Sequence, residues 1–290
     1  MSETIDAATG PTIGVIGCGQ MGAGISEVCA RAGLNVVVVE STAASGVTGR
    51  RRLEASLRRA EQKGLIPSGE EILARIQIVD QLDAMADRDI VVEAIAEDEA
   101  AKVVVFQALD RIVASPKAIL ASNTSSIPIM KLAAATNRPS HVLGIHFFNP
   151  VPVLSLVELV PSLFTDDDVL GRAREFVQTR LGKHAIRSQD RAGFVVNALL
   201  VPYILSAIRM MESGFATAAD IDEGMVRGCA HPQGPLALAD LIGLDTTKAV
   251  ADSLYREFKE PLYSPPPLLA RMVEAGLLGR KSGRGFYTYD

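Results

Sequence analysis

Short apolar runs alternate with longer amphipathic stretches over the first two thirds of the chain. Thr12–Ile16 and Leu34–Val39 are rich in β-branched residues, and Ile25–Ala32 between them has the spacing of a helix. Short buried strands separated by helices are typical of a mostly parallel sheet that is covered on both faces. The same pattern predicts further strands at Arg75–Val79, Asp89–Val92, Ala118–Ala121, His141–Phe147 and Lys183–Arg187. The chain is therefore predicted to begin with an α/β domain.

The pattern changes near Gln189. From Gly193 onward it is helical, with Gly/Pro breaks at residues 213–214, 231–235 and 264–267. We predict an amino-terminal domain of residues 1–189 and an all-α domain of residues 190–290. About 100 residues bury little core when they fold alone, so we expect this second domain to dock or to dimerise through the apolar helix at residues 192–211.

Composition narrows the class of protein. Apolar residues make up 48% and charged residues 22%, as in ordinary globular proteins, and the net charge of −5 argues against a nucleic-acid or anionic-membrane partner. The longest apolar stretch, residues 192–207, is interrupted by Asn197 and Pro202 and falls short of the ~20 residues that a membrane span needs. Met1–Pro11 lacks the apolar core of a signal peptide, and the three cysteines have no metal-ligand spacing. We expect a cytoplasmic protein without a structural metal.

A glycine motif follows the first predicted strand. Gly17, Gly19 and Gly22 have the G-x-G-x-x-G spacing, and the motif opens a helix. In a dinucleotide-binding turn these glycines make the tight turn, let the backbone approach the pyrophosphate and allow close packing of the helix. Glu40 follows the next strand, eighteen residues after Gly22. The motif in this context predicts a Rossmann-type domain.

Glu40 also bears on the cofactor. A carboxylate at this position hydrogen-bonds the ribose hydroxyls and repels a 2′-phosphate, which favours NAD over NADP. Arg50, Arg51 and Arg52 are cations that would weaken this preference, but they lie a helical turn or more away along the chain. NAD is therefore the predicted cofactor.

The candidate base is His146, at the end of an apolar run. Glu158 follows twelve residues later, after a loop that contains Asn149-Pro150 and a second apolar run. Two strands joined by this loop would bring the two side chains together, and a neutral imidazole held by a carboxylate is a general base near neutral pH. The alternative is that His146 is a structural histidine with its hydrogen bonds satisfied.

A basic helix is predicted at residues 46–64, with six cations in fourteen residues. It is either a solvated helix face or a binding site for a substrate that carries several phosphates. Ser56 and Lys63 lie seven residues apart and therefore on one face of this helix.

Polar residues follow two later strands. Glu97 and Lys102 come after the strand at 89–92, and S-N-T-S-S at 122–126 follows the strand at 118–121. Ligands bind at the carboxyl ends of strands in open parallel sheets, where these side chains would contact cofactor or substrate. Alternatively, they favour the starts of the helices that follow.

Taken together, these motifs resemble the short-chain L-3-hydroxyacyl-CoA dehydrogenase family, in particular the bacterial 3-hydroxybutyryl-CoA dehydrogenases. The resemblance covers nearly the whole chain in order. It is carried by G-C-G-Q-M-G-A-G-I at 17–25, V-V-E-A-I-A-E at 91–97, S-N-T-S-S at 122–126, H-F-F-N-P at 146–150, G-F-V-V-N at 193–197, H-P-Q-G-P-L-A-L-A-D-L-I-G-L-D at 231–245 and G-R-K-S-G-R-G-F-Y at 279–287.

The resemblance implies hydride transfer between NAD and C3 of a 3-hydroxyacyl-CoA. It places His146 as the catalytic base, Glu158 as its orienting partner, and Ser125 and Asn197 as donors to the substrate oxygen. Ser56 and Lys63 match positions that contact the CoA nucleotide. The positions that match the cofactor site are Gly17, Gly19, Gln20, Met21, Gly22, Glu40, Glu97, Lys102, Asn123 and Asn149. Asn149 has the alternative roles of a further donor to the substrate or of shaping the turn before Pro150.

Rival functions remain at this stage. One is a dehydrogenase of a free hydroxy acid or sugar acid, such as the L-gulonate type, although a small acid needs one cation rather than six. Others are a non-catalytic cofactor-binding relative, and an accessory subunit that binds acyl-CoA as the partner of a hydratase. The acyl chain length and the physiological direction do not follow from the residues.

Overall fold

An eight-stranded sheet forms the centre of the first part of the chain, with the strand order β3-β2-β1-β4-β5-β6-β7-β8. The computed structural model describes residues 10–289, and the chain passes from one folded unit to a second between Asp190 and Arg191. Strands β1 to β6 are parallel, β7 is antiparallel to β6, and β8 is parallel to β7. The strands are β1 Ile13–Ile16, β2 Val36–Val39, β3 Ile76–Val79, β4 Ile90–Glu93, β5 Ile119–Ser122, β6 Val142–Phe147, β7 Leu156–Pro161 and β8 His184–Arg187. This confirms the predicted Rossmann-type fold.

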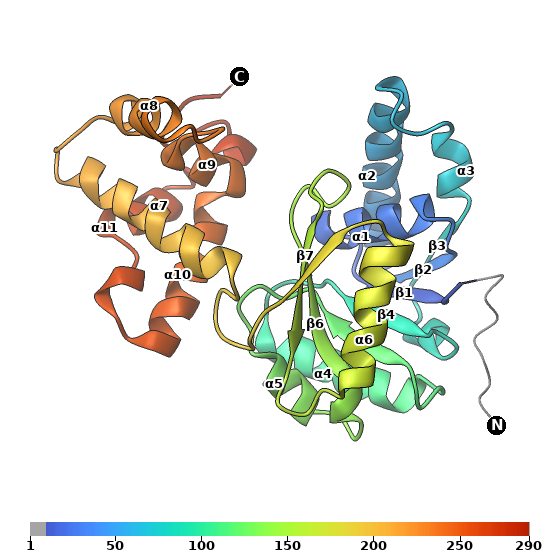
Figure 1. The fold of residues 1–290 in the computed structure, drawn as a ribbon. Coiled ribbons are helices and arrows are strands. Elements are labelled where there is room, and N and C mark those ends of the chain that lie inside the picture. The colour runs from blue at the N-terminus through green and yellow to red at the C-terminus, as the bar shows by residue number, and fades with distance from the viewer. Residues whose placement is uncertain (1–9, 290) are drawn as a thin grey trace. The chain divides into compact units, whose positions relative to one another are not determined.

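Helices cover both faces of the sheet (Figure 1). Apolar residues of α1, α2, α3 and α6 form one buried core with alternate residues of the strands. On the opposite face, Ile129 of α5 lies directly over Gly144 of β6. The helices of this unit are α1 Gln20–Arg31, α2 Ala43–Gln62, α3 Gly69–Leu73, α4 Glu99–Ile112, α5 Ile129–Ala134 and α6 Asp167–Glu175, with short helical turns at Leu82–Met85, Pro139–His141 and Phe176–Arg180.

The strand alternation decides which side chains reach which face. Ile145 and Phe147 of β6 belong to the core beneath α1 and α6. Because successive side chains of a strand point to opposite faces, Gly144 and His146 lie on the face that α5 covers. His146 is therefore placed at the carboxyl end of β6, on the side opposite the larger core.

Several helix boundaries differ from the sequence prediction: the basic helix predicted at 46–64 is α2, Ala43–Gln62, and the apolar helix predicted at 192–211 is an α-helix only from Val196 to Glu212. Helix α1 begins at Gln20, five residues before the predicted start, because its first turn is made by the glycine motif itself, which has no apolar periodicity. The predicted helix from Thr165 to Leu181 is an α-helix only from Asp167 to Glu175 and then widens into a π-helical turn. Asp98 is the N-cap of α4 and accepts the Ala101 N–H at 2.8 Å, so its role is to stabilise the start of this helix.

The second unit is helical, as predicted. Its core comes mainly from α7, α9, α10 and α11, with Ile204, Leu236, Leu254 and Leu269 fully buried. The only ladder contacts described are isolated bridges near its end, at Gly279, Arg284 and Thr288. The helices are α7 Val196–Glu212, α8 Ala218–Cys229, α9 Pro235–Ile242, α10 Leu244–Phe258 and α11 Pro267–Glu274, with helical turns at Pro261–Tyr263 and Arg280–Ser282. Among residues 10–289, no helix is both long and apolar enough to span a membrane.

Two buried aspartates tie this unit together. Asp222 of α8 accepts the Leu236 and Ala237 N–H groups at the start of α9, both at 2.8 Å. Asp240 of α9 accepts the Phe286 and Tyr287 N–H groups at 3.0 and 2.9 Å. The two carboxylates thus replace backbone partners that the helix start and the carboxyl-terminal segment lack.

Candidate active site

His146 and Glu158 are direct cross-strand partners in the antiparallel pairing of β6 with β7. The His146 Nδ1 atom lies 2.7 Å from a Glu158 carboxylate oxygen, and the two residues are 5% and 0% exposed. A carboxylate accepts a hydrogen-bearing nitrogen at this distance, so the contact favours the tautomer with its hydrogen on Nδ1. The ring of Phe148 meets the imidazole edge-on at 4.6 Å between centroids. Residues twelve positions apart in the sequence thus meet in the structure, where Glu158 orients the buried imidazole of His146.

The loop between β6 and β7 is held from outside the hairpin. Its Asn149–Pro150 peptide bond is cis, and Asn149 itself is exposed. The Lys183 ammonium donates to the carbonyl oxygens of Val151 and Leu154, both at 2.7 Å. Burial lowers the pKa of Lys183, and the nearby Arg31 lowers it further. Lys183 was not singled out from the sequence, because nothing local links it to this loop.

The glycine motif forms a tight loop between β1 and α1. Gly17 has φ +92, and a Cβ there would lie 2.8 Å from the carbonyl oxygen of Ala94. A Cβ on Gly22 would lie 1.9 Å from the carbonyl oxygen of Gly17, whereas a Cβ on Gly19 would meet nothing within 4 Å. The loop is therefore closed by two glycines and open at the third, as a backbone that approaches a pyrophosphate requires. These features fit a dinucleotide.

Glu40 completes this loop. Its carboxylate accepts the N–H groups of Cys18, at 2.5 Å, and of Ser41, at 3.2 Å. The Arg52 guanidinium donates to the Cys18 carbonyl at 2.8 Å, so α2 is tied to the glycine loop from the other side. Gln20, exposed, and Met21, half-buried, are the first residues of α1 beside the loop. Burial and the Glu40 carboxylate raise the pKa of Cys18 to about 11, so this thiol stays protonated near neutral pH.

The segment 122–126 lies next to β6. Asn123 accepts the Phe147 N–H with its side-chain oxygen at 2.8 Å, one residue after His146. Glu97 accepts the Ser125 N–H at 3.0 Å, the Ser126 N–H at 3.1 Å and the Thr124 hydroxyl at 2.5 Å. Ser125 is half-buried. The structure therefore brings Asn123, Ser125 and Glu97 together with the end of β6.

Lys102 is almost completely buried, at 1% exposure. Its ammonium lies 2.5 Å from a Glu93 oxygen and 3.3 Å from a Glu97 oxygen. Burial opposes the charge of Glu97, but the Lys102 ammonium and the hydrogen bonds from Thr124, Ser126 and Ser125 hold the pKa of that carboxyl below its usual range. Glu93 belongs to the motif at 91–97, but the sequence assigns it no role, because the position of a residue in a strand does not indicate which side chains it will bind.

Ser56 lies in α2, whereas Lys63 was predicted within the helix and is instead the residue that directly follows its last turn. Ser56 is half-buried and Lys63 is exposed. Of the six cations, Arg50 pairs with Glu54 at 3.1 Å and Arg52 binds the glycine loop. The exposed cations Arg51, Arg58, Arg59 and Lys63 keep this helix basic.

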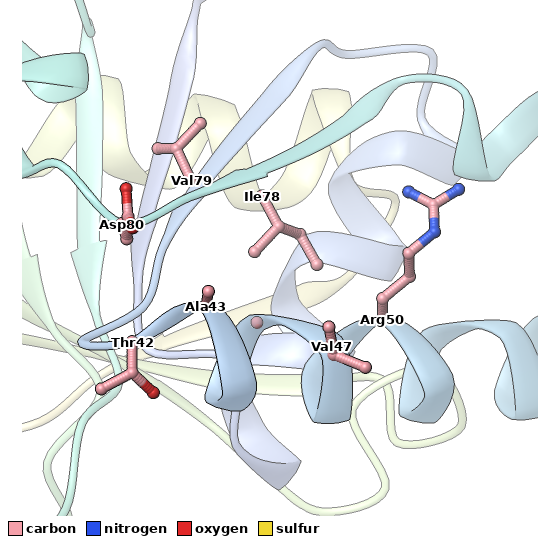
Figure 2. A pocket seen from close by; sticks show the side chains of 8 residues that line it. Thr42, Ala43, Val47, Arg50, Ile78, Val79 and Asp80 are labelled. Atoms are coloured by element: carbon pink, nitrogen blue, oxygen red, sulfur yellow. The ribbon is translucent and has the colours of Figure 1, made fainter.

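A pocket of about 310 Å³ lies between the first turns of α2 and the end of β3. Figure 2 shows Ile78 of β3 directed toward the helix that carries Ala43 and Val47, with Arg50 and Asp80 at the margins. The Glu40 N–H donates to the Val79 carbonyl at 2.9 Å, so the pocket adjoins the glutamate of the nucleotide loop. It does not include His146.

Asn197 belongs to the second unit, where it is the second residue of α7 and half-buried. Its assignment to the substrate oxygen stays a prediction. Asp190, the last residue of the first unit, was not predicted from the sequence to have a role. It accepts the Ile129 and Met130 N–H groups, both at 2.7 Å, at the start of α5.

A parallel sheet with a glycine loop at β1 and an oriented histidine at β6 defines the class of nucleotide-dependent dehydrogenases. Comparison with known families agrees. Residues 12–191 match the family model described as "3-hydroxyacyl-CoA dehydrogenase, NAD binding domain", and residues 193–289 match its C-terminal domain. The chain belongs to the 3-hydroxyacyl-CoA dehydrogenase family and is an NAD-dependent oxidoreductase.

Individual relatives support the same placement. The chain is 58% identical to a 3-hydroxybutyryl-CoA dehydrogenase of Mycobacterium tuberculosis, over 96% of this chain and 98% of that one. It is 40% identical to a mitochondrial hydroxyacyl-coenzyme A dehydrogenase of Sus scrofa, over 95% and 90% of the two chains. The crystal structure of an (S)-3-hydroxybutyryl-CoA dehydrogenase from Ralstonia eutropha superposes with a TM-score of 0.90 at 45% identity, covering 97% of this chain and 99% of that one.

Proposed function

We propose that the protein oxidises the 3-hydroxyl of an (S)-3-hydroxyacyl-CoA, with 3-hydroxybutyryl-CoA as the substrate, or reduces acetoacetyl-CoA in reverse. The observation that carries the proposal is the buried contact of 2.7 Å between His146 and Glu158. The printed names of the Mycobacterium tuberculosis and Ralstonia eutropha relatives support the four-carbon acyl group.

His146 takes the hydroxyl proton in the oxidative direction. Its Nε2 accepts the proton while Nδ1–H remains on Glu158, and the carboxylate stabilises the imidazolium that forms. NAD, when bound at the glycine loop, supplies the acceptor for the hydride from C3. Ser125 and Asn197 are proposed to donate hydrogen bonds to the reacting oxygen, which in the reductive direction polarises the carbonyl.

The remaining assignments concern binding. Glu40 is proposed to accept the ribose hydroxyls of NAD, and its contact with the Cys18 N–H supports a fixed carboxylate there. Ser56 and Lys63 are proposed to contact the CoA nucleotide, supported by the exposed cations of α2. Glu97 and Lys102 are proposed to lie near the nicotinamide half, and Asn123 and Asn149 to contact the cofactor. We also propose a homodimer formed by the second unit and a cytosolic location, the latter supported by three cysteines that form no disulfide.

The test is a comparison of NADH and NADPH oxidation with acetoacetyl-CoA. We expect turnover with NADH, and a loss of about 10²–10⁴-fold in kcat for His146→Ala because the general base is removed. Glu158→Gln should also lose activity, because glutamine provides no charge for the imidazolium. A matched control is His141→Ala, which removes the other histidine of the β6 segment, at the opposite end of the strand. It should keep wild-type turnover.

Three outcomes would contradict parts of this proposal. Faster turnover with NADPH would overturn the argument from Glu40. Activity on hydroxy acids that lack CoA, without activity on acetoacetyl-CoA, would replace the substrate. NADH binding without turnover of either kind would favour a non-catalytic relative.

A further inference from the structure

Glu93 is a buried carboxylate at the last position of β4, with 0% exposure. It is the direct cross-strand partner of Ser122 in β5. One oxygen accepts the Ser122 hydroxyl at 2.6 Å, and the other accepts the Lys102 ammonium at 2.5 Å and the Ile95 N–H at 2.7 Å. A buried charge without such partners would be costly, and here both oxygens are occupied by donors.

Lys102 links this carboxylate to a second one. Glu97 lies 3.3 Å from the same ammonium and holds the peptide N–H groups of Ser125 and Ser126. We call Glu93, Lys102 and Glu97 the acid–lysine cluster. It holds the segment 122–126 at both ends, through Ser122 at one end and through Ser125 and Ser126 at the other.

The cluster is placed at the reaction site by the sheet. Ser122 pairs with Gly144, which precedes His146 by two residues on β6. Asn123 binds the Phe147 N–H, and the Asn123 N–H donates to the Glu93 carbonyl at 2.8 Å. The geometry of Glu93 is thus transmitted to the residues beside His146 through hydrogen bonds.

The formal charge of the cluster is −1, from two carboxylates and one ammonium. Glu97 is the member that reaches solvent, with 36% of its side chain exposed. The nicotinamide ring is positively charged in NAD⁺ and neutral in NADH. A net negative charge beside the ring therefore attracts the ring of the oxidised cofactor only.

We propose that Glu93 is a positioning residue that holds Lys102 and Glu97 in place and keeps the acid–lysine cluster at a charge of −1, which shifts the balance of cofactor binding toward NAD⁺ and away from NADH. The inference rests on the proposed function only in placing the nicotinamide beside Glu97. By linkage, tighter binding of the oxidised form lowers the reduction potential of the bound cofactor by the same free energy.

The experiment measures the ratio of the dissociation constants for NADH and NAD⁺, from NADH fluorescence and from its competition by NAD⁺. Glu93→Gln makes the cluster neutral with nearly the same shape. We expect the ratio of the NADH dissociation constant to the NAD⁺ dissociation constant to fall by about fivefold, mainly through weaker NAD⁺ binding, as expected for the loss of one unit charge at this range. A purely structural role would weaken both cofactors alike and would leave the ratio unchanged.

Charge rescue sharpens the test. The double variant Glu93→Gln/Lys102→Gln restores a charge of −1, and its ratio should return to within about twofold of the wild type, because replacing both members of a buried pair is tolerated better than removing one. The control Glu99→Gln removes one carboxylate from the exposed pair with Lys131, whose nitrogen and oxygen atoms lie 2.7 Å apart, and should not change the ratio.

The outcomes separate this inference from the proposed function. An unchanged ratio in Glu93→Gln, or a double variant that keeps the value of the single one, overturns the role of the charge even if the wild type reduces acetoacetyl-CoA. If the ratio of dissociation constants changes with the charge of the cluster in the variants, but the wild type does not turn over acetoacetyl-CoA, the inference is supported and the proposed function is overturned. If Glu93→Gln does not fold, Glu97→Gln, also neutral, is compared with the double variant, and equal ratios would contradict the proposal.

Discussion

At the scale of single residues, buried carboxylates link separate segments of the chain by accepting their hydrogen bonds. Each is surrounded by donors: Glu158 by an imidazole, Glu93 by an ammonium and a hydroxyl, and Asp240 by backbone N–H groups. Such hydrogen bonds to charged groups contribute more than neutral ones, and leaving a donor unmatched costs about 1–3 kcal/mol. Conservative amide variants are therefore informative probes, since they keep the shape and change only the charge and the number of acceptors.

Asp240→Asn tests this in the second unit. One Asp240 oxygen accepts the Phe286 N–H, and the other accepts the Tyr287 N–H and the Tyr289 hydroxyl. An asparagine keeps one acceptor and turns its NH₂ group toward the donors on the other side. We expect the free energy of unfolding to fall by about 1–3 kcal/mol in urea titrations. Asp245→Asn, which removes an exposed partner of Lys281, should change it by less than about 0.5 kcal/mol. Equal effects of the two variants would contradict a special role for Asp240.

The same contact makes stability depend on alkaline pH. Burial, together with the Asp240 carboxylate, raises the pKa of Tyr289 to about 12, above the value of about 10 in an unfolded chain. The unfolded phenol therefore loses its proton first, so stability is complete below about pH 10 and declines from there to about pH 12. Urea midpoints across this range should fall with pH, and less steeply in Asp240→Asn. A flat profile in the wild type would show that Tyr289 titrates normally.

At the scale of elements, helix α1 packs closely against the glycine loop because the glycines there have no side chains. A Cβ on Gly22 would overlap the carbonyl oxygen of Gly17 at 1.9 Å, and neither atom belongs to a flexible side chain. The helix start and the nucleotide loop thus form one rigid feature, in which Gly22 brings the loop back against the first turn of the helix.

Gly22→Ala should therefore impair NADH binding by at least about tenfold and lower stability by roughly 1–3 kcal/mol, because the clash displaces loop or helix. The matched control is Gly171→Ala in α6, where a Cβ meets nothing within 4 Å. Since alanine is the better helix former, this variant should gain about 0.5–1 kcal/mol without changing NADH binding. Fluorescence titration and urea unfolding measure both effects. Normal NADH affinity in Gly22→Ala would contradict the assignment of the loop.

At the scale of the whole molecule, the chain divides into two units, with the division between Asp190 and Arg191. The second unit exposes large apolar side chains on and directly after α7: Leu199 is 73% exposed and Phe215 is 80% exposed. Exposed apolar groups on one helix are typical of an interface. This agrees with the proposed dimer but does not require a particular geometry.

Leu199→Asp is expected to convert the dimer to a monomer in sedimentation experiments, because a carboxylate would be buried without a partner. Leu163→Asp is the control: Leu163 is 92% exposed in the turn after β7 of the first unit and should leave the dimer intact. A wild-type protein that sediments only as a monomer would end the dimer proposal.

Several features of the site could be predicted from local sequence. The glycine loop, the acid after β2 and the strand that carries His146 each depend on residues close together in the chain, and the structure shows all three. The start of α1 was placed five residues late because small residues at a helix start make no apolar pattern. The role of Glu93 could not be predicted, since it depends on Ser122 and Lys102, which neither a strand nor a helix period connects to it.

The sequence by itself determined the α/β pattern of the first part of the chain and the helical pattern of the second, because strand and helix periods and backbone sterics are local properties. It also indicated the glycine loop and the candidate base. Only the tertiary structure decided the register that sets His146 opposite Glu158, and the burial of Lys102 between two carboxylates. Register and ion pairing depend on how separate elements pack against one another, and they are selected by packing and desolvation of the whole sheet rather than by any single segment.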